Sequence, residues 1–271
     1  MITYGSRDKI FLLSGKNYSY CMYVNRMGIL QHLYWGRKIA AADACFLKAQ
    51  RGVAAEPSEG DRNADMATGG MPQELGSFGR GDFRSATVVV RRKDGAAMSR
   101  FCYVSHKIVK GAVPLAGMPC ARKADETLTI TLKDALSDIE LDLNYSVSED
   151  SDILVRNTVV RNAGKDAVAI AKAFSFCTEL PDTCGTRSAL RLAGAWASER
   201  KPIVTPIAEG SLRIESLCGY SSHAMNPFLA VLSEGCGEED GECCGFCLLY
   251  SGSFAITADV SHNKSIRVQG G

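Results

Sequence analysis

Apolar and polar residues alternate with a period of two along much of this chain. The clearest case is residues 138–147, DIELDLNYSV, in which every second position is apolar. Successive side chains of a β-strand point to opposite faces, so this pattern predicts a strand with one buried face and one solvated face. The side chains expected on the buried face are Ile139, Leu141, Leu143, Tyr145 and Val147.

Similar patterns predict many more short strands. Turn residues separate them, as in Lys93-Asp94-Gly95 and Asn162-Ala163-Gly164-Lys165. Helical periodicity is weak, and the best helix candidate is the short segment 38–50. Short strands at regular spacing predict an all-β protein, a large antiparallel sandwich with few or no long helices. The other predicted strands are 87–90, 127–132, 153–160, 167–176, 211–216, 228–232, 246–250 and 253–260.

Residues 51–81 differ from the rest of the chain because they show no periodicity and are rich in Gly, Pro, Asp, Asn, Ser and Met. A loop of this length in a compact domain is usually functional or mobile. No internal repeat and no linker divides the sequence, so we expect residues 1–271 to form one domain. Alternation continues to Val268 and then stops, so we expect the chain to be cut short of its natural end.

Composition and charge narrow the classes of protein further. The chain is 46% hydrophobic and 23% charged, which is ordinary for a folded protein with a full core. A net charge of +1 and the absence of a basic stripe argue against a nucleic-acid partner. No run reaches the roughly 18 apolar residues of a membrane helix, and the N-terminus lacks a signal-peptide pattern. We therefore predict a cytoplasmic protein with no membrane partner.

Several local patterns, taken together and in order, resemble one family. The first are LLSGKNYSYCMYVNRMGILQHLYWGRKI, MPQELGSFGRGDFRSATVVV and FCYVSHKIVKG, and the later ones are LRLAGAWASERKP, GYSSHAMNPFLAV and GFCLLYSGSF. The chain looks like the N-terminal domain of glycoside hydrolase family 36, the bacterial-type α-galactosidases. The resemblance runs from about residue 11 to 268.

The resemblance implies a galactose-mutarotase-like β-supersandwich, which in the family precedes a (β/α)₈ barrel and a small C-terminal β domain. Family members hydrolyse terminal α-galactosyl groups of raffinose-type sugars with retention, using two aspartates of the barrel. One sandwich fills these 271 residues, so no room is left for a typical barrel of about 250 residues. We therefore assign no catalytic residue and expect the chain to be inactive by itself.

Two residues are carried over from the family as candidate sugar-binding residues. Trp196, in the segment GAWASER, matches a tryptophan that the family places at the galactose pocket. Arg62 matches an arginine that, in tetrameric members, reaches a neighbouring subunit's active site. The aspartate that accompanies this arginine is not evident here, because Gln50 and Arg51 stand where it should lie. The resemblance implies α-galactoside sugars as partners and a homo-oligomer, a tetramer in the family.

The stretch 235–252, GCGEEDGECCGFCLLYSG, holds four of the 11 cysteines and raises a different possibility, a metal or redox module. In the family register it is a hairpin, with an acidic turn followed by a strand over 242–250. Cys243 and Cys247 would then lie on one face and Cys244 on the other. A zinc knuckle needs converging sulfurs on a tight turn, so packing as small hydrophobes is favoured, with no metal and no cofactor.

Asp82, Arg84 and His32 belong to the family patterns, and structural roles are favoured for them over roles at the site. Two other functions stay open beside the α-galactosidase domain. One is a stand-alone carbohydrate-binding β-sandwich, and the other is the cysteine-rich module.

Overall fold

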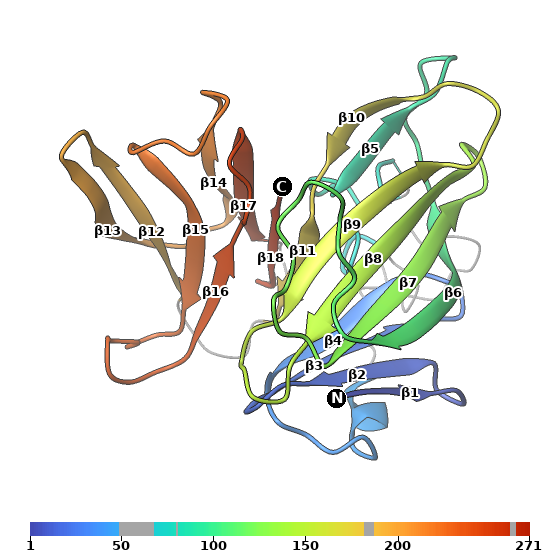
Figure 1. Cartoon of the computed structure of the whole chain (residues 1–271), viewed down its shortest axis with the longest axis horizontal. Helices are drawn as coiled ribbons and strands as arrows, with labels where there is room; N and C mark the ends of the chain where they lie inside the picture. Colours follow the sequence, from blue (N-terminus) through green and yellow to red (C-terminus); the bar gives the residue numbers. More distant parts are fainter. Residues whose placement is uncertain (49–67, 80, 182–186, 261–263) are drawn as a thin grey trace. The chain divides into compact units, whose positions relative to one another are not determined.

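The structure is a computed structural model that describes residues 1–48, 68–79, 81–181, 187–260 and 264–271. Within these residues it consists of antiparallel strands and one short 3₁₀ helix, which confirms the all-β prediction (Figure 1). No described helix has the length and hydrophobicity needed to span a bilayer. The chain divides into two compact units, Met1–Glu179 and Leu180–Gly271. Whether residues 1–271 act as one domain stays a prediction.

Unit 1 contains two four-stranded antiparallel sheets and a two-stranded ribbon. The first sheet has the order β1-β2-β3-β4, the second has the order β6-β7-β8-β9, and the ribbon joins β5 and β10. The strands of the first sheet are β1 (Ile2–Gly5), β2 (Ile10–Ser14), β3 (Tyr18–Val24) and β4 (Leu30–Arg37). Those of the second are β6 (Phe101–Lys110), β7 (Glu126–Asp134), β8 (Ile139–Val147) and β9 (Val155–Asn162). The ribbon strands are β5 (Val88–Arg91) and β10 (Ala169–Ala173), and β11 (Phe176–Leu180) follows.

The main core of unit 1 lies between apolar faces of its two four-stranded sheets. Phe11 and Tyr20 of the first sheet belong to the same buried cluster as Leu128 and Leu141 of the second. All five side chains predicted to point inward on β8 are at most 1% exposed. The predicted solvated face of β8 is wrong at Asn144 and Ser146, which are buried. Thr129 Oγ1 donates to Asn144 Oδ1 at 2.7 Å, so a polar ladder replaces water there.

The helix candidate 38–50 forms no α-helix in the part that the structure describes. Only one 3₁₀ turn forms, η1 (Ala44–Leu47). Ala44, Ile39 and Leu47 pack over the second face of the first sheet, against Ile10, Leu12 and Cys21. Both faces of β3 are therefore covered, and its burial is nearly continuous. Continuous burial removes the period-two signal, which explains why β3 is absent from the predicted set.

Unit 2 also contains two antiparallel sheets. The strands β13, β12, β15 and β16 lie side by side in that order, and β17 pairs with both β14 and β18. Their bounds are β12 (Ser188–Ala195), β13 (Ser198–Pro206), β14 (Gly210–Ser216), β15 (Met225–Leu232), β16 (Cys243–Cys247), β17 (Phe254–Val260) and β18 (Ile266–Gly270). Strand β15 packs against β14 and β17, so the two sheets share a core.

Candidate functional site

Trp196 lies at the tip of the tight hairpin that joins β12 to β13 in unit 2. Ala195 pairs with Ser198, which leaves Trp196 and Ala197 as the two loop residues. The indole is 84% exposed, the highest value among the large apolar side chains of the described residues. The other tryptophan, Trp35, instead packs at the edge of the unit 1 core, 5.8 Å from the Tyr20 ring. Its flat apolar face and its N–H are therefore both open to a ligand.

The residues around Trp196 fix this hairpin in one shape. Ala197 and Arg200 both have left-handed backbone conformations, with φ of 56° and 57°. Such conformations cost energy for residues other than glycine and are concentrated at functional sites. Glu199 stabilises the loop, because its carboxylate accepts a hydrogen bond from the Ala197 N–H at 3.1 Å. The Gly194 N–H donates to Ala224 O at 3.2 Å and ties the hairpin to the segment before β15.

Gly194 is required by close approach of the backbone rather than by an unusual φ. A Cβ at this position would lie 2.8 Å from the Glu199 Cα and would also collide with Ser198 O. We expect Gly194→Ala to lower the free energy of unfolding of unit 2 by about 1–3 kcal/mol, since overpacking forces the backbone to shift. Urea denaturation followed by circular dichroism measures the change. Ser198→Ala, on the same hairpin, is the control, and equal midpoints for the two variants would refute the packing argument.

The second predicted sugar-binding residue, Arg62, lies outside the described residues, so the structure places only Trp196. Asp82 and Arg84 are described, and they form a structural cluster in unit 1. Arg84 Nε donates to Asp82 Oδ1 at 2.9 Å, and Arg84 Nη1 donates to Glu179 Oε2 at 2.9 Å. Both carboxylates are almost fully buried. The structural role favoured for Asp82 and Arg84 is therefore supported by their contacts.

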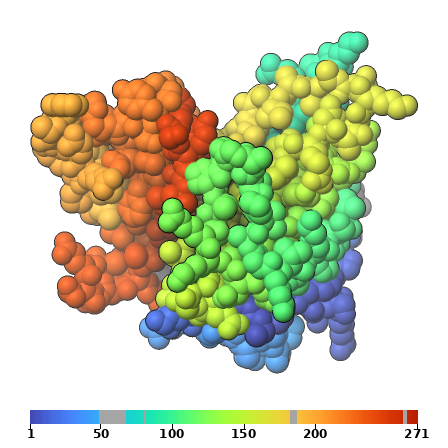
Figure 2. Space-filling model, viewed as in Figure 1, coloured from blue at the N-terminus to red at the C-terminus, as the bar shows by residue number. Residues whose placement is uncertain are grey.

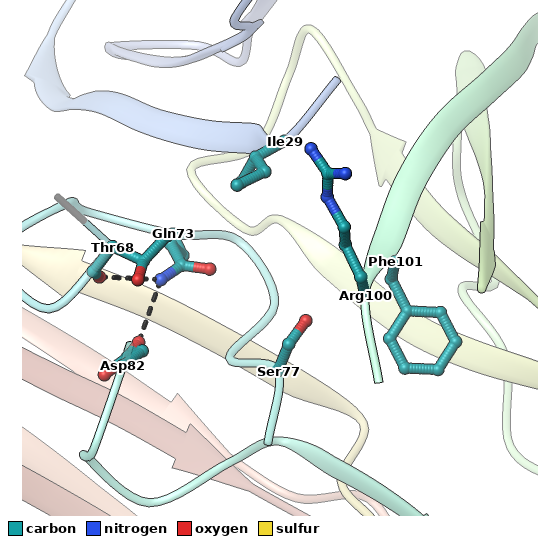
Figure 3. A pocket seen from close by; sticks show the side chains of 7 residues that line it. All are labelled: Ile29, Thr68, Gln73, Ser77, Asp82, Arg100 and Phe101. Atoms are coloured by element: carbon teal, nitrogen blue, oxygen red, sulfur yellow. Dashed lines mark hydrogen bonds between the residues drawn. The ribbon is translucent and has the colours of Figure 1, made fainter. Parts of the chain in front are cut away.

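A small pocket adjoins this cluster (Figure 3). Gln73 crosses it and donates to Asp82 Oδ2 at 2.8 Å and to Thr68 O at 3.1 Å. The pocket volume of about 10 Å³ is close to the space that a single water molecule needs. The pocket is therefore too small for a sugar ring. It is lined by Ile29, Thr68, Gln73, Ser77, Asp82, Arg100 and Phe101.

A larger pocket of unit 1, of about 310 Å³, lies among loops. It falls in the size range of small-molecule sites. Its lining includes Arg92, Lys93 and Lys165 beside Asp94, Asp138 and Asp166. No aromatic residue lines this pocket, so it lacks the flat apolar face that a pyranose ring stacks on. The geometry therefore leaves Trp196 as the better sugar-binding candidate.

Glu74 in unit 1 is a buried charged residue that the sequence patterns did not indicate. Its side chain is fully buried, and it accepts hydrogen bonds from both sheets. Tyr20 OH and His32 Nδ1 lie 2.7 Å from Oε1, while Tyr145 OH and Arg156 Nη1 lie 2.8 and 2.9 Å from Oε2. Arg156 also donates to Glu74 O at 2.6 Å and to Cys177 O. The structural role favoured for His32 is supported by its hydrogen bond to Glu74.

The electrostatics of this cluster follow from its burial and its pairing. Burial opposes the charge on Glu74, but Arg156 and the hydrogen bond from His32 outweigh it and hold the carboxyl pKa below its ordinary value. Burial and the neighbouring Glu74 carboxylate raise the pKa of the Tyr20 hydroxyl well above its ordinary value. Glu74 is therefore a charged structural centre whose oxygens are fully engaged, rather than a proton-transfer group open to a substrate.

The cysteine stretch forms the predicted hairpin strand, although β16 is shorter than expected at Cys243–Cys247. Cys243 and Cys247 lie on one face and Cys244 on the other, but Cys243 and Cys247 are exposed, so the packing prediction is wrong for these two. Cys236, Cys243 and Cys247 are free thiols. In that part of the chain, no group of three His, Cys, Asp or Glu side chains could hold a metal ion.

Comparison with known proteins decides the family. The family model of the glycosyl hydrolase family 36 N-terminal domain matches residues 28–271. The chain belongs to glycosyl hydrolase family 36. It is 31% identical to the α-galactosidase AgaA of Geobacillus stearothermophilus over 100% of this chain and 37% of AgaA. It is also 31% identical to the bifunctional α-galactosidase/sucrose kinase AgaSK of Mediterraneibacter gnavus, over 98% of this chain and 29% of AgaSK.

The fold of this family 36 chain also matches solved structures. Superposition on an AgaA structure from Geobacillus stearothermophilus in complex with raffinose gives a TM-score of 0.90 at 30% identity. The match covers 97% of this chain and 37% of that one. The chain therefore spans about a third of the length of these relatives, and the family assignment made from the sequence motifs is confirmed.

Proposed function

We propose that this chain is the N-terminal part of a retaining α-galactosidase that hydrolyses terminal α-galactosyl groups of raffinose-type oligosaccharides. The family assignment and the relatives' names support the reaction class. The relative solved with raffinose supports the substrate class. In this proposal the chain contributes to the sugar pocket and to subunit contacts, while the catalytic carboxylates belong to a different part of the enzyme.

The observation that carries the proposal is the presentation of Trp196. Its indole is 84% exposed on a two-residue loop, between a glycine that excludes any side chain and residues held in left-handed conformations. One flat face of an indole can stack on the apolar face of a pyranose, and its N–H can donate to a sugar hydroxyl. The hairpin therefore gives Trp196 the properties of a preorganised sugar contact.

Catalysis needs groups that the Trp196 hairpin does not offer. Retaining hydrolysis requires two carboxyl groups about 5–5.5 Å apart, one as nucleophile and one as acid/base. The acidic residue of the hairpin, Glu199, accepts a hydrogen bond from the loop backbone. We therefore infer that the chain positions the sugar and that the reaction depends on the catalytic part of the enzyme.

A stand-alone carbohydrate-binding module is the alternative, and the exposure of Trp196 favours it as a second candidate. Titrating the 271-residue chain with raffinose while recording tryptophan fluorescence separates the two functions. Trp196 is the solvent-exposed fluorophore, and Trp35 provides an inner reference. We expect no saturable change below about 10 mM. Stacking on a single indole is worth about 2.5 kcal/mol, which corresponds to a Kd above about 10 mM. A saturable change that Trp196→Ala abolishes would favour the stand-alone module.

Homo-oligomeric assembly and a cytoplasmic location stay predictions. The trans-subunit contact was assigned to Arg62, which lies outside the described residues.

A further inference from the structure

Strand β16 is an open edge of its sheet in unit 2. It pairs with β15 on one side, and no described strand lies along its other side. Ser233 N donates to Glu242 O, and Leu248 N donates to Pro227 O, both at 2.9 Å. Because backbone groups of an antiparallel strand alternate in direction, the even-numbered residues bond toward β15. Cys243, Gly245 and Cys247 therefore direct their backbone N–H and C=O groups toward the open side.

The two edges of this sheet differ in how they are protected. The opposite edge, β13, carries Arg200, Lys201, Pro202 and Pro206, all of which discourage pairing with another strand. Strand β16, with the sequence CCGFC, has no charge and no proline. An uncharged edge with free backbone groups is a template for pairing with another strand.

The cysteines on the exposed face of β16 are placed symmetrically about Gly245. Cys243 and Cys247 lie two residues to either side of it on the same exposed face, and Phe246 is buried on the other face. We propose that β16 pairs antiparallel with β16 of a second copy of this chain, with the two Gly245 residues opposite each other. Each Cys243 is then opposite Cys247 of the second copy, and the two four-stranded sheets become continuous.

Charge determines the direction of this pairing. The turn before β16 carries Glu238, Glu239 and Asp240, followed by Glu242 (Figure 2 shows this turn projecting from unit 2). Parallel pairing would place the two acidic turns side by side and would repel the copies. Antiparallel pairing places each acidic turn beside the neutral segment 248–252, LLYSG, of the other copy. Leu249, which is 60% exposed, would also gain cover there.

This contact is independent of the sugar contact. Trp196 lies on the β12–β13 hairpin, and β13 is the opposite edge of the same sheet. Dimer formation can therefore fail while the proposed function stands, and the reverse also holds.

Analytical ultracentrifugation of the 271-residue chain, from about 1 μM to about 1 mM, tests the pairing in the range where weak complexes dissociate. We expect a reversible dimer that Gly245→Lys weakens at least tenfold, because the two new cations would face each other. Gly245→Pro should weaken it similarly. Both variants should still fold. A Cβ at position 245 would lie 3.7 Å from the Phe228 ring, an ordinary contact, and the N–H that proline removes points away from β15. Ile203→Lys, on the β13 edge, is the control and should leave the dimer unchanged.

Thiol bridging with dibromobimane tests the register. Two thiols each lose a proton, their sulfurs displace the two bromides, and two C–S bonds replace two C–Br bonds, which releases two HBr. Opposite residues have Cα atoms about 5.5 Å apart, whereas identical cysteines of the two copies would be about 14 Å apart. We expect bridged dimers from the wild type and from a mixture of Cys243→Ser and Cys247→Ser, but not from either variant alone.

Three results would overturn the proposal. They are a monomer over the whole concentration range, a dimer that both Gly245 variants leave intact while circular dichroism shows native folding, and bridging by each single variant as efficient as by their mixture.

Discussion

Replacing Glu74 with glutamine is expected to lower the free energy of unfolding of unit 1 by about 3–5 kcal/mol, the usual cost of breaking a buried charge pair. The carboxylate accepts from donors on β3, β4, β8 and β9, so it joins the two sheets. A glutamine amide keeps one oxygen, and its NH₂ group would face two donors on the other side. Arg156, which is nearly buried, would also lose its counter-charge.

Urea denaturation that follows Trp35 fluorescence measures this loss, since Trp35 packs against the core of unit 1 beside Tyr20. Glu140→Gln is the matched control on β8. Glu140 pairs with Arg161 at 3.3 Å, but both side chains are partly exposed, so the control should change stability by less than about 1 kcal/mol. Equal midpoints for Glu74→Gln and Glu140→Gln would show that the Glu74 cluster does not stabilise the fold.

The same comparison has a predicted dependence on pH. The pKa of Glu74 is lower in the folded state than its ordinary value of 4.5. Its charge therefore contributes fully to stability above about pH 4.5, and this contribution is lost as the pH falls through the folded pKa. The stability difference between the wild type and Glu74→Gln should be largest near neutral pH and should shrink in acid. A difference that grows below pH 4.5 would contradict this assignment.

Trp196→Ala is expected to reduce the catalytic efficiency of a longer protein that joins this chain to its catalytic part. If a sugar covers about 100 Å² of the indole, the lost burial is worth about 2.5 kcal/mol, a factor of roughly 70 in kcat/KM. Stability should be unchanged, because the side chain is 84% exposed. Steady-state kinetics with raffinose and a thermal unfolding curve give both quantities.

Two further variants separate stacking from other effects at Trp196. Trp196→Phe keeps a flat apolar face and loses the indole N–H, so it should retain more activity than Trp196→Ala. Val204→Ala, at an exposed position of β13, should leave kcat/KM unchanged. If Trp196→Ala matched Val204→Ala in kcat/KM, the sugar contact would be refuted.

A strand could be predicted from the sequence where only one of its two faces is buried. Strand β8 showed its register in the sequence because its first half alternates between buried and half-buried positions. Strand β3 did not, because the segment around Ala44 covers its outer face and leaves no alternation to detect. The break that separates β10 from β11, at residues 174–175, was missed because no glycine or proline marks it.

The candidate site was predictable only where a motif carried it. Trp196 came from the family pattern. The close approach of Gly194 to Glu199 across the hairpin appears only in the structure. The Glu74 cluster was not predicted because its donors lie 42 to 82 residues away in sequence. No local pattern distinguishes such an acid from one on a solvated loop.

The rate at which the purified 271-residue chain hydrolyses a chromogenic α-galactoside tests the central claim most directly, namely that this chain binds sugar for a reaction that other residues catalyse. The same chain joined to the catalytic part of AgaA is the positive comparison. We predict a rate equal to the buffer blank for the chain alone and turnover for the joined protein. Turnover by the chain alone that follows the protein through successive purification steps would contradict this claim.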